Sequence, residues 1–228
     1  SDLAIVNLLP LKPGERVNAV ITIRDFDEAR YLVFVTKNGI VKKSLLSEYE
    51  TTRKTGLIAI TLREGDELIG VRLVDRHDHL ILGTALGMGI RFCVDNVTSV
   101  GRTAQGVIGI RLKPGDTVVS MDLVNPEQDV LIITEKGFGK RTDESEYRAQ
   151  QRGGSGVITQ KVNETTGKVA GLRVVGEHDD IMLCTSLGIM IRIETSGISR
   201  MGRNTRGVTL IKLEKDDTVA SMAVVEED

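Results

Sequence analysis

Leu131-Ile132-Ile133-Thr134-Glu135-Lys136-Gly137 is an apolar run that ends in a tight-turn sequence, and the chain repeats this pattern. The equivalent turns are Thr36-Lys37-Asn38-Gly39, Thr84-Ala85-Leu86-Gly87 and Thr185-Ser186-Leu187-Gly188. A second set of glycines keeps the same step: Gly56, Gly106, Gly156 and Gly207 are 50, 50 and 51 residues apart. Because a fixed period near fifty residues is typical of solenoids and propellers, the sequence predicts a repeat array in which each unit buries its apolar face against the next.

The elements of each repeat are predicted to be strands. Apolar runs such as Leu32-Val33-Phe34-Val35 are short, rich in Val and Ile, and bounded by Gly, Asn and Asp. Such runs favour strands with both faces buried over helices, which need longer stretches of 3.6-residue periodicity. We therefore expect an all-β, propeller-like fold.

The two ends of the chain fall at different points of the repeat. The strand that opens each unit recurs five times, at Val17, Leu68, Val118, Val169 and Val219, whereas the rest of the unit occurs four times. The segment 5–14 aligns with 106–115, so we expect the chain to begin inside an earlier repeat of a longer array. The predicted domain spans 1–228, with the tail of a preceding repeat at 1–16, repeats at 17–67, 68–117, 118–168 and 169–218, and a closing strand with an acidic tail at 219–228.

An array that is cut in this way leaves an apolar face and an open strand edge at each end. The exposed face and edge could be covered in three ways: the four units close more tightly, two chains meet edge to edge, or the ends of the chain fold over. The last strand, from Val219 to Val225, is expected to complete the preceding sheet.

The composition agrees with a soluble repeat domain. The 228 residues are 40% hydrophobic but only 3% aromatic, without Trp, so the core must consist of Val, Ile, Leu and Met. No stretch approaches the ~18 apolar residues of a membrane span, and the start lacks the layout of a signal peptide. Cys93 and Cys184 occupy different repeat positions, which gives no disulfide or metal pattern. We expect an intracellular protein with reduced cysteines.

The charge of the chain is nearly balanced, but its cations are periodic. There are 30 basic and 32 acidic residues and the pI is 6.0, which counts against a general nucleic-acid binder. A cation nevertheless follows each turn glycine by four residues. Another lies four residues before each glycine of the second set (the anchor glycines Gly56, Gly106, Gly156 and Gly207), except in the first repeat, where it lies three residues before. The predicted DNA-contact set is Lys42, Lys43, Arg53, Lys54, Arg91, Arg102, Lys140, Arg141, Arg152, Arg192, Arg203 and Arg206.

Two interpretations of this periodicity are open. DNA carries a charge every ~1.7 Å of helix axis, so cations on adjacent units could follow a backbone that bends around them, without reading its sequence. Duplicated structural salt bridges would produce the same periodicity. The acidic residues lie in other loops, such as Glu64-Gly65-Asp66-Glu67 and Lys215-Asp216-Asp217, so the two signs could occupy different faces.

An enzyme is the third class to consider. His77-Asp78-His79 and His178-Asp179-Asp180 contain possible metal ligands or proton carriers. His77 and His178 are 101 residues apart, two repeat steps, and Glu127 takes their place in the intervening unit, so polar turn residues are the better account. The chain has no phosphate-binding Gly-Lys-Ser/Thr loop and no nucleophile elbow. We expect no catalytic activity, cofactor or small-molecule substrate.

Several sequence segments of the repeats resemble those of one family and occur in the same order. They are Ile5-Val6-Asn7-Leu8-Leu9-Pro10-Leu11, Gly39-Ile40-Val41-Lys42-Lys43, Gly65-Asp66-Glu67-Leu68-Ile69-Gly70-Val71, Gly137-Phe138-Gly139-Lys140-Arg141-Thr142 and Gly202-Arg203-Asn204-Thr205-Arg206-Gly207-Val208. Together they resemble the C-terminal domain of the A subunit of DNA gyrase, a type IIA topoisomerase, over essentially the whole chain. The resemblance implies a β-pinwheel, whose blades exchange strands, and a DNA-wrapping function that supports ATP-dependent negative supercoiling by the full enzyme.

The same resemblance implies partners and location. The partners are double-stranded DNA, the rest of the gyrase A subunit, and the gyrase B subunit in an A2B2 assembly in the bacterial cytoplasm, at the nucleoid and away from membranes. ATP, magnesium and the DNA-cleaving tyrosine would belong to other parts of that enzyme, since Tyr31, Tyr49 and Tyr147 do not sit in the sequence context of that tyrosine. The related domain of the A subunit of topoisomerase IV and a protein-interaction propeller are the alternatives.

Two departures from the family limit what transfers. Gyrase pinwheels have six blades, whereas this chain holds four units that match the last four. The family's box, Gln-Arg-Arg-Gly-Gly-Lys-Gly, belongs to the first blade, and the nearest run here is Gln150-Gln151-Arg152-Gly153-Gly154-Ser155-Gly156 in the third unit. Gln151 and Ser155 depart from the box, so we interpret the run as a repeat-equivalent loop with a DNA contact at Arg152, and we expect weaker DNA binding than that of an intact domain.

Overall fold

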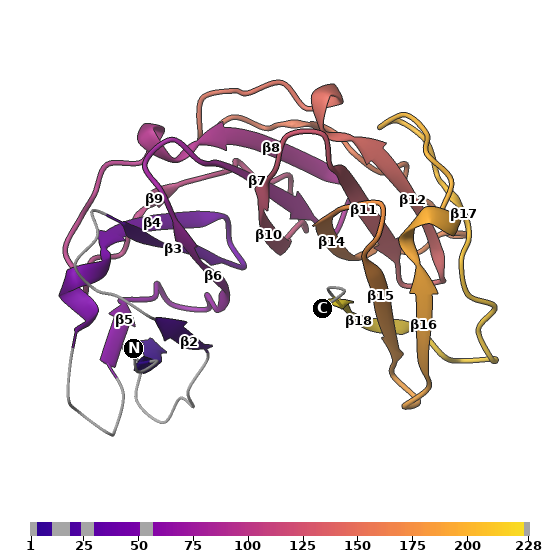
Figure 1. Cartoon of the computed structure of the whole chain (residues 1–228), viewed down its shortest axis with the longest axis horizontal. Helices are drawn as coiled ribbons and strands as arrows, with labels where there is room; N and C mark the ends of the chain where they lie inside the picture. Colours follow the sequence, from indigo (N-terminus) through magenta and orange to yellow (C-terminus); the bar gives the residue numbers. More distant parts are fainter. Residues whose placement is uncertain (1–3, 11–18, 24–29, 51–56, 226–228) are drawn as a thin grey trace.

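The protein forms an open arch of small sheets. The computed structural model describes residues 4–10, 19–23, 30–50 and 57–225. The sheets stand side by side, with the N-terminal sheet at one end and the last sheet at the other (Figure 1). The four units do not close into a ring, which rules out the first of the three ways of covering the ends. No helix within the described ranges is long and apolar enough to cross a bilayer.

The fold is all-β, as predicted, and the blades are its units. Strand order in each blade runs from the concave to the convex side of the arch (Figure 1). The first blade contains β6 (Leu68–Val74), β3 (Tyr31–Thr36), β4 (Ile40–Leu45) and β9 (Val107–Ile108). The second contains β10 (Val118–Val124), β7 (His79–Thr84), β8 (Met88–Cys93) and β13 (Val157–Ile158). The third contains β14 (Val169–Val175), β11 (Asp129–Thr134), β12 (Phe138–Asp143) and β17 (Val208–Thr209).

The two end sheets have three strands each within the described residues. The fourth blade contains β18 (Val219–Val225), β15 (Asp180–Thr185) and β16 (Met190–Glu194), so the last strand does complete the preceding sheet. The N-terminal sheet contains β2 (Ala19–Ile23), β1 (Ala4–Pro10) and β5 (Leu57–Ile60), and β1 pairs parallel with β5. Short 3-10 turns follow the second hairpin strand of each blade; they are η1 (Leu46–Tyr49), η2 (Val94–Asn96), η3 (Glu144–Glu146) and η4 (Thr195–Gly197).

The outermost strand of each complete blade comes from the following repeat. β9 pairs with β4 of the first blade although it follows β8 of the second in sequence, and β13 and β17 do the same one and two blades later. The structure therefore shows the strand exchange that the family resemblance implies. Repeat and blade boundaries are offset, because the strand that opens one repeat also completes the sheet of the repeat before it.

The apolar cores lie between blades. Val33 and Val35 of β3 pack in one cluster with residues of the second blade such as Leu82, while Leu32 and Phe34 face the opposite side in a separate cluster. Both faces of the strand are thus buried, as the unbroken apolar run predicts. Equivalent cores fill the junctions between the second and third blades and between the third and fourth.

The turn glycines receive the exchanged strands. The Gly39 carbonyl, in a residue with φ of +88°, accepts hydrogen bonds from the Gly109 and Ile110 N–H groups at 2.8 and 3.3 Å. The Gly87 and Gly137 carbonyls accept the same pair of bonds from the repeats that follow them. A left-handed residue is needed at this position, and glycine adopts that conformation without steric cost. The repeated turn glycines of the sequence therefore encode the docking of one blade on the next.

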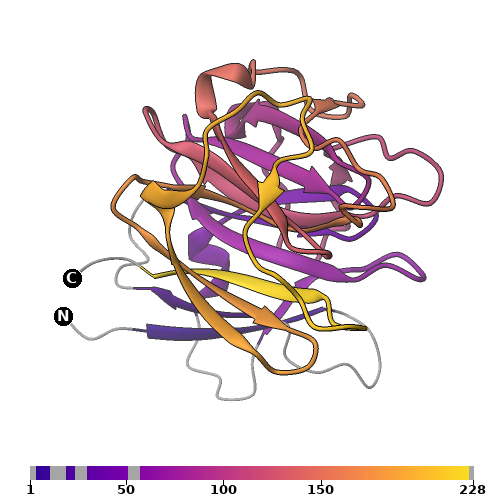
Figure 2. The same ribbon diagram turned by 90° about the vertical axis from the view of Figure 1, so that its right-hand side faces the viewer.

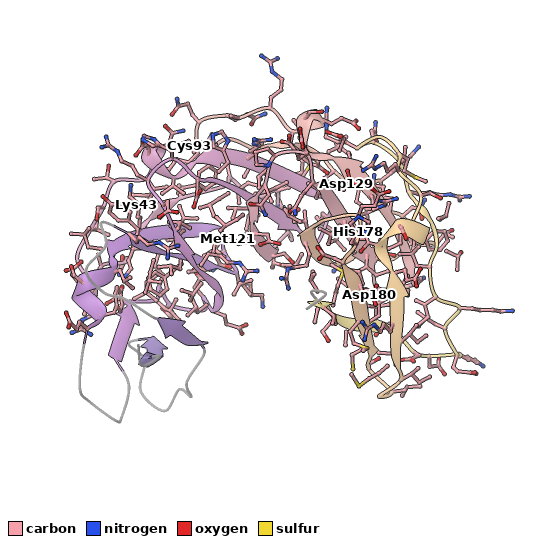
Figure 3. All side chains as sticks on the ribbon, viewed as in Figure 1. Lys43, Cys93, Met121, Asp129, His178 and Asp180 are labelled. Atoms are coloured by element: carbon pink, nitrogen blue, oxygen red, sulfur yellow. The ribbon has the colours of Figure 1, made fainter. Side chains whose placement is uncertain are left out.

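The concave side of the arch carries an ion-paired bridge across three blades. β6, β10 and β14 are neighbours there, and Arg72, Asp122 and Arg173 hold equivalent positions on them. The buried Asp122 carboxylate lies 3.3 Å from Arg72 Nη2 and 3.2 Å from Arg173 Nε. Figure 3 places Met121, the preceding residue, toward this concave side. One carboxylate thus holds three consecutive inner strands together.

The N-terminal strands β1 and β2 and the last strand, β18, lie on the same side of the arch. Figure 2, which views the arch from its C-terminal end, shows β18 and the N-terminal strands on that side. The exchanged strands and the loops that lead into them lie on the other side, along the convex edge (Figure 1).

Replacement of an anchor glycine tests the docking. A Cβ atom at Gly106, where φ is +92°, would lie 2.4 Å from the Val41 carbonyl oxygen, whereas at Gly115, with φ of +78°, it would meet nothing within 4 Å. We expect Gly115→Ala to lower the free energy of unfolding by about 1 kcal/mol through backbone strain alone. Gly106→Ala should lower it by about 3 kcal/mol, because the clash separates two blades. Urea denaturation measures both, and equal losses would contradict this account of Gly106.

Candidate nucleic-acid interface

The cations that follow the turn glycines are paired inside their own hairpins. Arg141 of β12 is 6% exposed, and its Nη1 lies 3.2 Å from the Asp129 carboxylate at the start of β11. Arg192 repeats the pair in the fourth blade, where its Nε lies 2.6 Å from the Asp180 carboxylate. Asp129 also receives Arg200 Nε at 2.8 Å, so this one carboxylate serves two guanidinium groups. Figure 3 shows where Asp129 and Asp180 lie in neighbouring blades.

The first two blades keep this contact with different partners. Lys43 Nζ lies 4.6 Å from the centre of the Tyr31 ring and donates to the Val94 carbonyl at 3.2 Å. Arg91 Nε donates to His79 Nδ1 at 3.1 Å, and its Nη1 pairs with the Glu144 carboxylate. In every blade the cation therefore reaches the first residue of the strand beside it. Burial, reinforced by the Arg91 charge, lowers the pKa of His79.

The two lysines that precede these cations are buried deepest. Lys42 and Lys140 are both 0% exposed, and their ammonium groups bond to backbone carbonyls of the next repeat. Burial lowers the pKa of Lys42 to about 7 and that of Lys140 to about 8. A side chain in such a position has no surface to offer a phosphate.

The prediction that the post-turn cations contact DNA is therefore corrected for five of the residues. Lys42, Lys43, Lys140 and Arg141 are buried, and Arg91 is mostly buried against Glu144. Of the two interpretations left open, structural pairing accounts for this row. Arg192, with a side chain 56% exposed, is the one post-turn cation among the described residues that reaches solvent while paired. Arg53 and Lys54 lie outside the described residues.

The arginines before the anchor glycines lie on outer loops. Arg152 donates from Nε to the Asn96 carbonyl and from Nη1 to the Ile108 carbonyl, both at 3.1 Å. Arg203 repeats the second bond one blade later, with Nη1 3.1 Å from the Ile158 carbonyl. Arg102 is the half-exposed equivalent in the loop that covers the first blade. Arg152 and Arg203 each brace a loop against the neighbouring exchanged strand and leave part of the side chain in solvent.

A further row of cations was not predicted. Arg111, Lys161 and Lys212 are all exposed and follow the exchanged strands at steps of 50 and 51 residues. The Arg111 N–H donates to the Gly154 carbonyl at 2.9 Å and the Lys161 N–H to the Thr205 carbonyl at 3.0 Å, which sets each residue beside the next arginine loop. Their spacing is the repeat period that the glycines and the opening strands also show in the sequence.

The loop arginines and this row together follow the convex edge of the arch. We call them the outer basic ribbon, which consists of Arg102, Arg111, Arg152, Lys161, Arg203, Arg206 and Lys212. Arg206 lies over the Phe138 ring at 6.0 Å, and its side chain is exposed. Figure 3 shows nitrogen-tipped side chains projecting from this edge.

One recurring set of acidic residues, Asp66, Asp116 and Asp217, caps the hairpin turns. Asp66 Oδ1 accepts the Asn38 N–H at 2.9 Å, and Asp116 Oδ1 accepts the Leu86 N–H at 2.9 Å. Asp217 does the same in the last hairpin. All three residues are buried, so they fix hairpin turns and do not neutralise the exposed cations.

The box-like run has the geometry of an ordinary outer loop. The Gly153 N–H, in a residue with φ of +84°, donates to the Gly109 carbonyl at 2.7 Å, and the Gly154 carbonyl accepts from Arg111. These are contacts between adjacent repeats, as at the other junctions. Within the described ranges no three His, Cys, Asp or Glu side chains gather as a metal site, and Cys93 and Cys184 are free.

The repeats match those of a known family. A family model described as DNA gyrase C-terminal domain, beta-propeller, matches residues 30–75, 78–125, 128–176 and 179–226. The DNA gyrase A subunit of Clostridium acetobutylicum is 52% identical over 224 residues, which cover 98% of this chain and 27% of that relative. The Helicobacter pylori homologue is 43% identical over 91% of this chain and 26% of its own length. The chain thus spans about a quarter of the length of the curated relatives that it matches.

Solved structures of such domains have the same architecture. The C-terminal domain of a DNA topoisomerase IV superposes with a TM-score of 0.87 at 30% identity, covering 95% of this chain and 68% of that one. A DNA gyrase A C-terminal domain superposes with a TM-score of 0.83 at 26% identity, covering 94% of this chain and 72% of that one.

The paired carboxylates allow a test of which cations are structural. Asp129→Ala would leave the buried Arg141 guanidinium without its carboxylate, a loss that typically costs about 3–5 kcal/mol of unfolding free energy. Asp180→Ala removes the same pair where the arginine is 56% exposed, and there we expect about 1 kcal/mol or less. Thermal unfolding of the two variants gives the comparison. A small loss for Asp129→Ala would mean that Arg141 needs no internal partner.

The buried lysines predict a dependence of stability on pH. Their pKa values of about 7 and about 8 lie below that of an unfolded lysine, so the unfolded state binds more protons at moderately alkaline pH. The free energy of unfolding should therefore rise between about pH 7 and pH 10. Desolvation is the main cause of both lowered pKa values; the charges of Glu48 and Glu146 oppose it, and those of Arg102 and Arg203 add to it.

Denaturation at a series of pH values, in the parent chain and in Lys42→Met/Lys140→Met, measures this rise. The double variant should lack it. Above about pH 10 the buried Tyr147, whose pKa burial raises to about 12, acts in the opposite direction, so the comparison should stop there. An equal slope in both proteins would show that neither lysine titrates as its burial implies.

Proposed function

Because the chain belongs to the DNA gyrase C-terminal domain family, we propose that it binds double-stranded DNA along the outer basic ribbon, without sequence specificity, as a wrapping module of the gyrase A subunit. The observation that carries this proposal is the ribbon itself. Exposed cations recur at equivalent positions in successive blades, on the convex edge, while the recurring turn-cap carboxylates of Asp66, Asp116 and Asp217 are buried.

The geometry suits a bent phosphate backbone. Blades set side by side along an arch present their outer loops in a curved row (Figure 1), and cations spaced along such a row neutralise successive phosphates as the duplex follows it. Contacts of this kind fix the position of the duplex and carry no base information. Bending has an elastic cost, which repeated contacts along the curve offset.

The proposal assigns the chain an accessory role. Strand passage, ATP hydrolysis and magnesium binding would belong to the remaining parts of an A2B2 gyrase assembly in the bacterial cytoplasm, and this chain would contribute DNA wrapping toward negative supercoiling without a cofactor of its own. The fold alone would also suit the equivalent domain of topoisomerase IV, with which the chain shares a TM-score of 0.87. The relatives at 52% and 43% identity, both gyrase A proteins, favour gyrase.

Salt titration of DNA binding tests the ribbon. The logarithm of the binding constant for a short duplex should fall linearly with the logarithm of salt concentration, with a slope of about −0.9 per phosphate contact. Arg111→Ala/Lys161→Ala/Lys212→Ala should weaken binding to all duplex sequences alike and make the slope shallower by about 3, since three contacts are lost.

The control removes three exposed cations that are not members of the outer basic ribbon, in Arg63→Ala/Lys168→Ala/Lys215→Ala. This variant has the same net charge as the ribbon variant, so it separates local contacts from overall charge. The proposal is wrong if the parent chain fails to bind duplex at low salt, which would favour a protein-interaction propeller, or if the two triple variants lose affinity equally.

A further inference from the structure

A buried ammonium group lies beneath one of the arginine loops. Lys140 Nζ donates to the Gly202 carbonyl at 3.0 Å, the Arg203 carbonyl at 2.6 Å and the Thr205 carbonyl at 2.9 Å. The Thr205 hydroxyl is a fourth acceptor at 3.0 Å. An ammonium has three hydrogens to donate, so these oxygens use all of them. The lysine comes from β12, whereas the loop belongs to the next repeat.

The first blade repeats this arrangement. Lys42 Nζ donates to the Arg102 carbonyl and to the Tyr49 hydroxyl, the latter at 3.2 Å. In both blades the lysine bonds to the carbonyl of the loop arginine itself. The lysine therefore fixes the backbone from which the guanidinium projects, and not the guanidinium.

The second and fourth blades lack the lysine. Ile90 and Ile191 stand at its position, so the loop that covers the second blade has an apolar side chain beneath it. That loop is held by other bonds: the Gly153 N–H donates to the Gly109 carbonyl at 2.7 Å, and the Arg152 side chain donates to the Asn96 carbonyl. The chain thus contains loops of both kinds, and it shows that an apolar residue fits at this point of the hairpin.

We propose that Lys42 and Lys140 are positioning residues for DNA binding, which hold the loops of Arg102 and of Arg203 and Arg206 in the outer basic ribbon. This inference rests on the proposed DNA-binding function. A carbonyl that loses its buried donor must find water or another partner, because an unsatisfied buried polar group is costly. In the 202–206 loop the lysine is the donor to three carbonyls, so its loss favours conformations in which these carbonyls turn toward water, and this shifts the arginines.

Lys140→Met tests the proposal directly. Methionine fills the space of the lysine stem and cannot donate, and the isoleucines in the other blades show that the blade accepts such a residue. We expect faster hydrogen exchange of the amides in 202–206, with little change in β11. Ile90→Met is the matched control, and it should leave exchange in 150–156 unchanged. This measurement needs no DNA, so its outcome is independent of the proposed function.

A mutant cycle tests the consequence for DNA. Lys140→Met alone should make the salt slope shallower by about 2, as should Arg203→Ala/Arg206→Ala, because both remove the same two phosphate contacts. Adding Lys140→Met to that double variant should cause no further loss of affinity. A lysine that only stabilised the fold would instead give losses that add.

The outcomes separate the two proposals. Unchanged exchange in 202–206 of Lys140→Met, or additive losses of affinity, would overturn the positioning role while leaving DNA binding intact. A parent chain that binds no duplex at low salt would overturn the proposed function whatever the exchange shows. Should Lys140→Met fail to fold, Thr205→Val removes one acceptor of the ammonium and the Thr205 bond to Gly202, and it should loosen the same loop to a smaller extent.

Discussion

The bond between a turn glycine and the strand of the next repeat is the contact on which the molecule depends. At Gly39, Gly87 and Gly137 a single carbonyl accepts two N–H groups from the following unit. Each blade is therefore completed by its successor, and the outer loop that leads into the exchanged strand takes its position from the same contact. The period near fifty residues persists because each unit must fit the turn before it and present an equal turn to the one after it.

The exchange also divides the cations into two groups. Strands of the central hairpins are covered on both faces by neighbouring blades, so a lysine or arginine there must find partners inside, as Lys43 does with Tyr31 and Arg141 does with Asp129. The loops beside the exchanged strands lie on the convex edge and leave their cations, such as Arg111, exposed. The same repeat period thus places one group of cations in internal pairs and another group on the surface.

The sequence was sufficient for the fold but only in part for the site. Turn glycines, strand-like apolar runs and the five-fold recurrence of the opening strand predicted an all-β repeat array with a closing strand at Val219. Whether a cation points inward or outward could not be predicted. Strands that are buried on both faces lack the alternation of apolar and polar residues that would identify a solvent-facing side. Lys42 and Arg102 were therefore placed in one set, although the first lies beneath the carbonyl of the second. Arg111 was missed because the strand that it follows, β9, has only two residues.

The curvature of the proposed DNA path is set on the opposite side of the arch from the cations. Arg72 and Arg173 share the Asp122 carboxylate across three inner strands, which keeps those strands close on the concave side. The outer loops are joined only by backbone bonds and by side chains such as Arg152 that reach the neighbouring strand. The shared carboxylate holds the inner strands close together. The outer spacing is set by the width of a blade, so the convex edge is the longer one. A duplex that follows it is bent by the shape of the protein, without any contact to its bases.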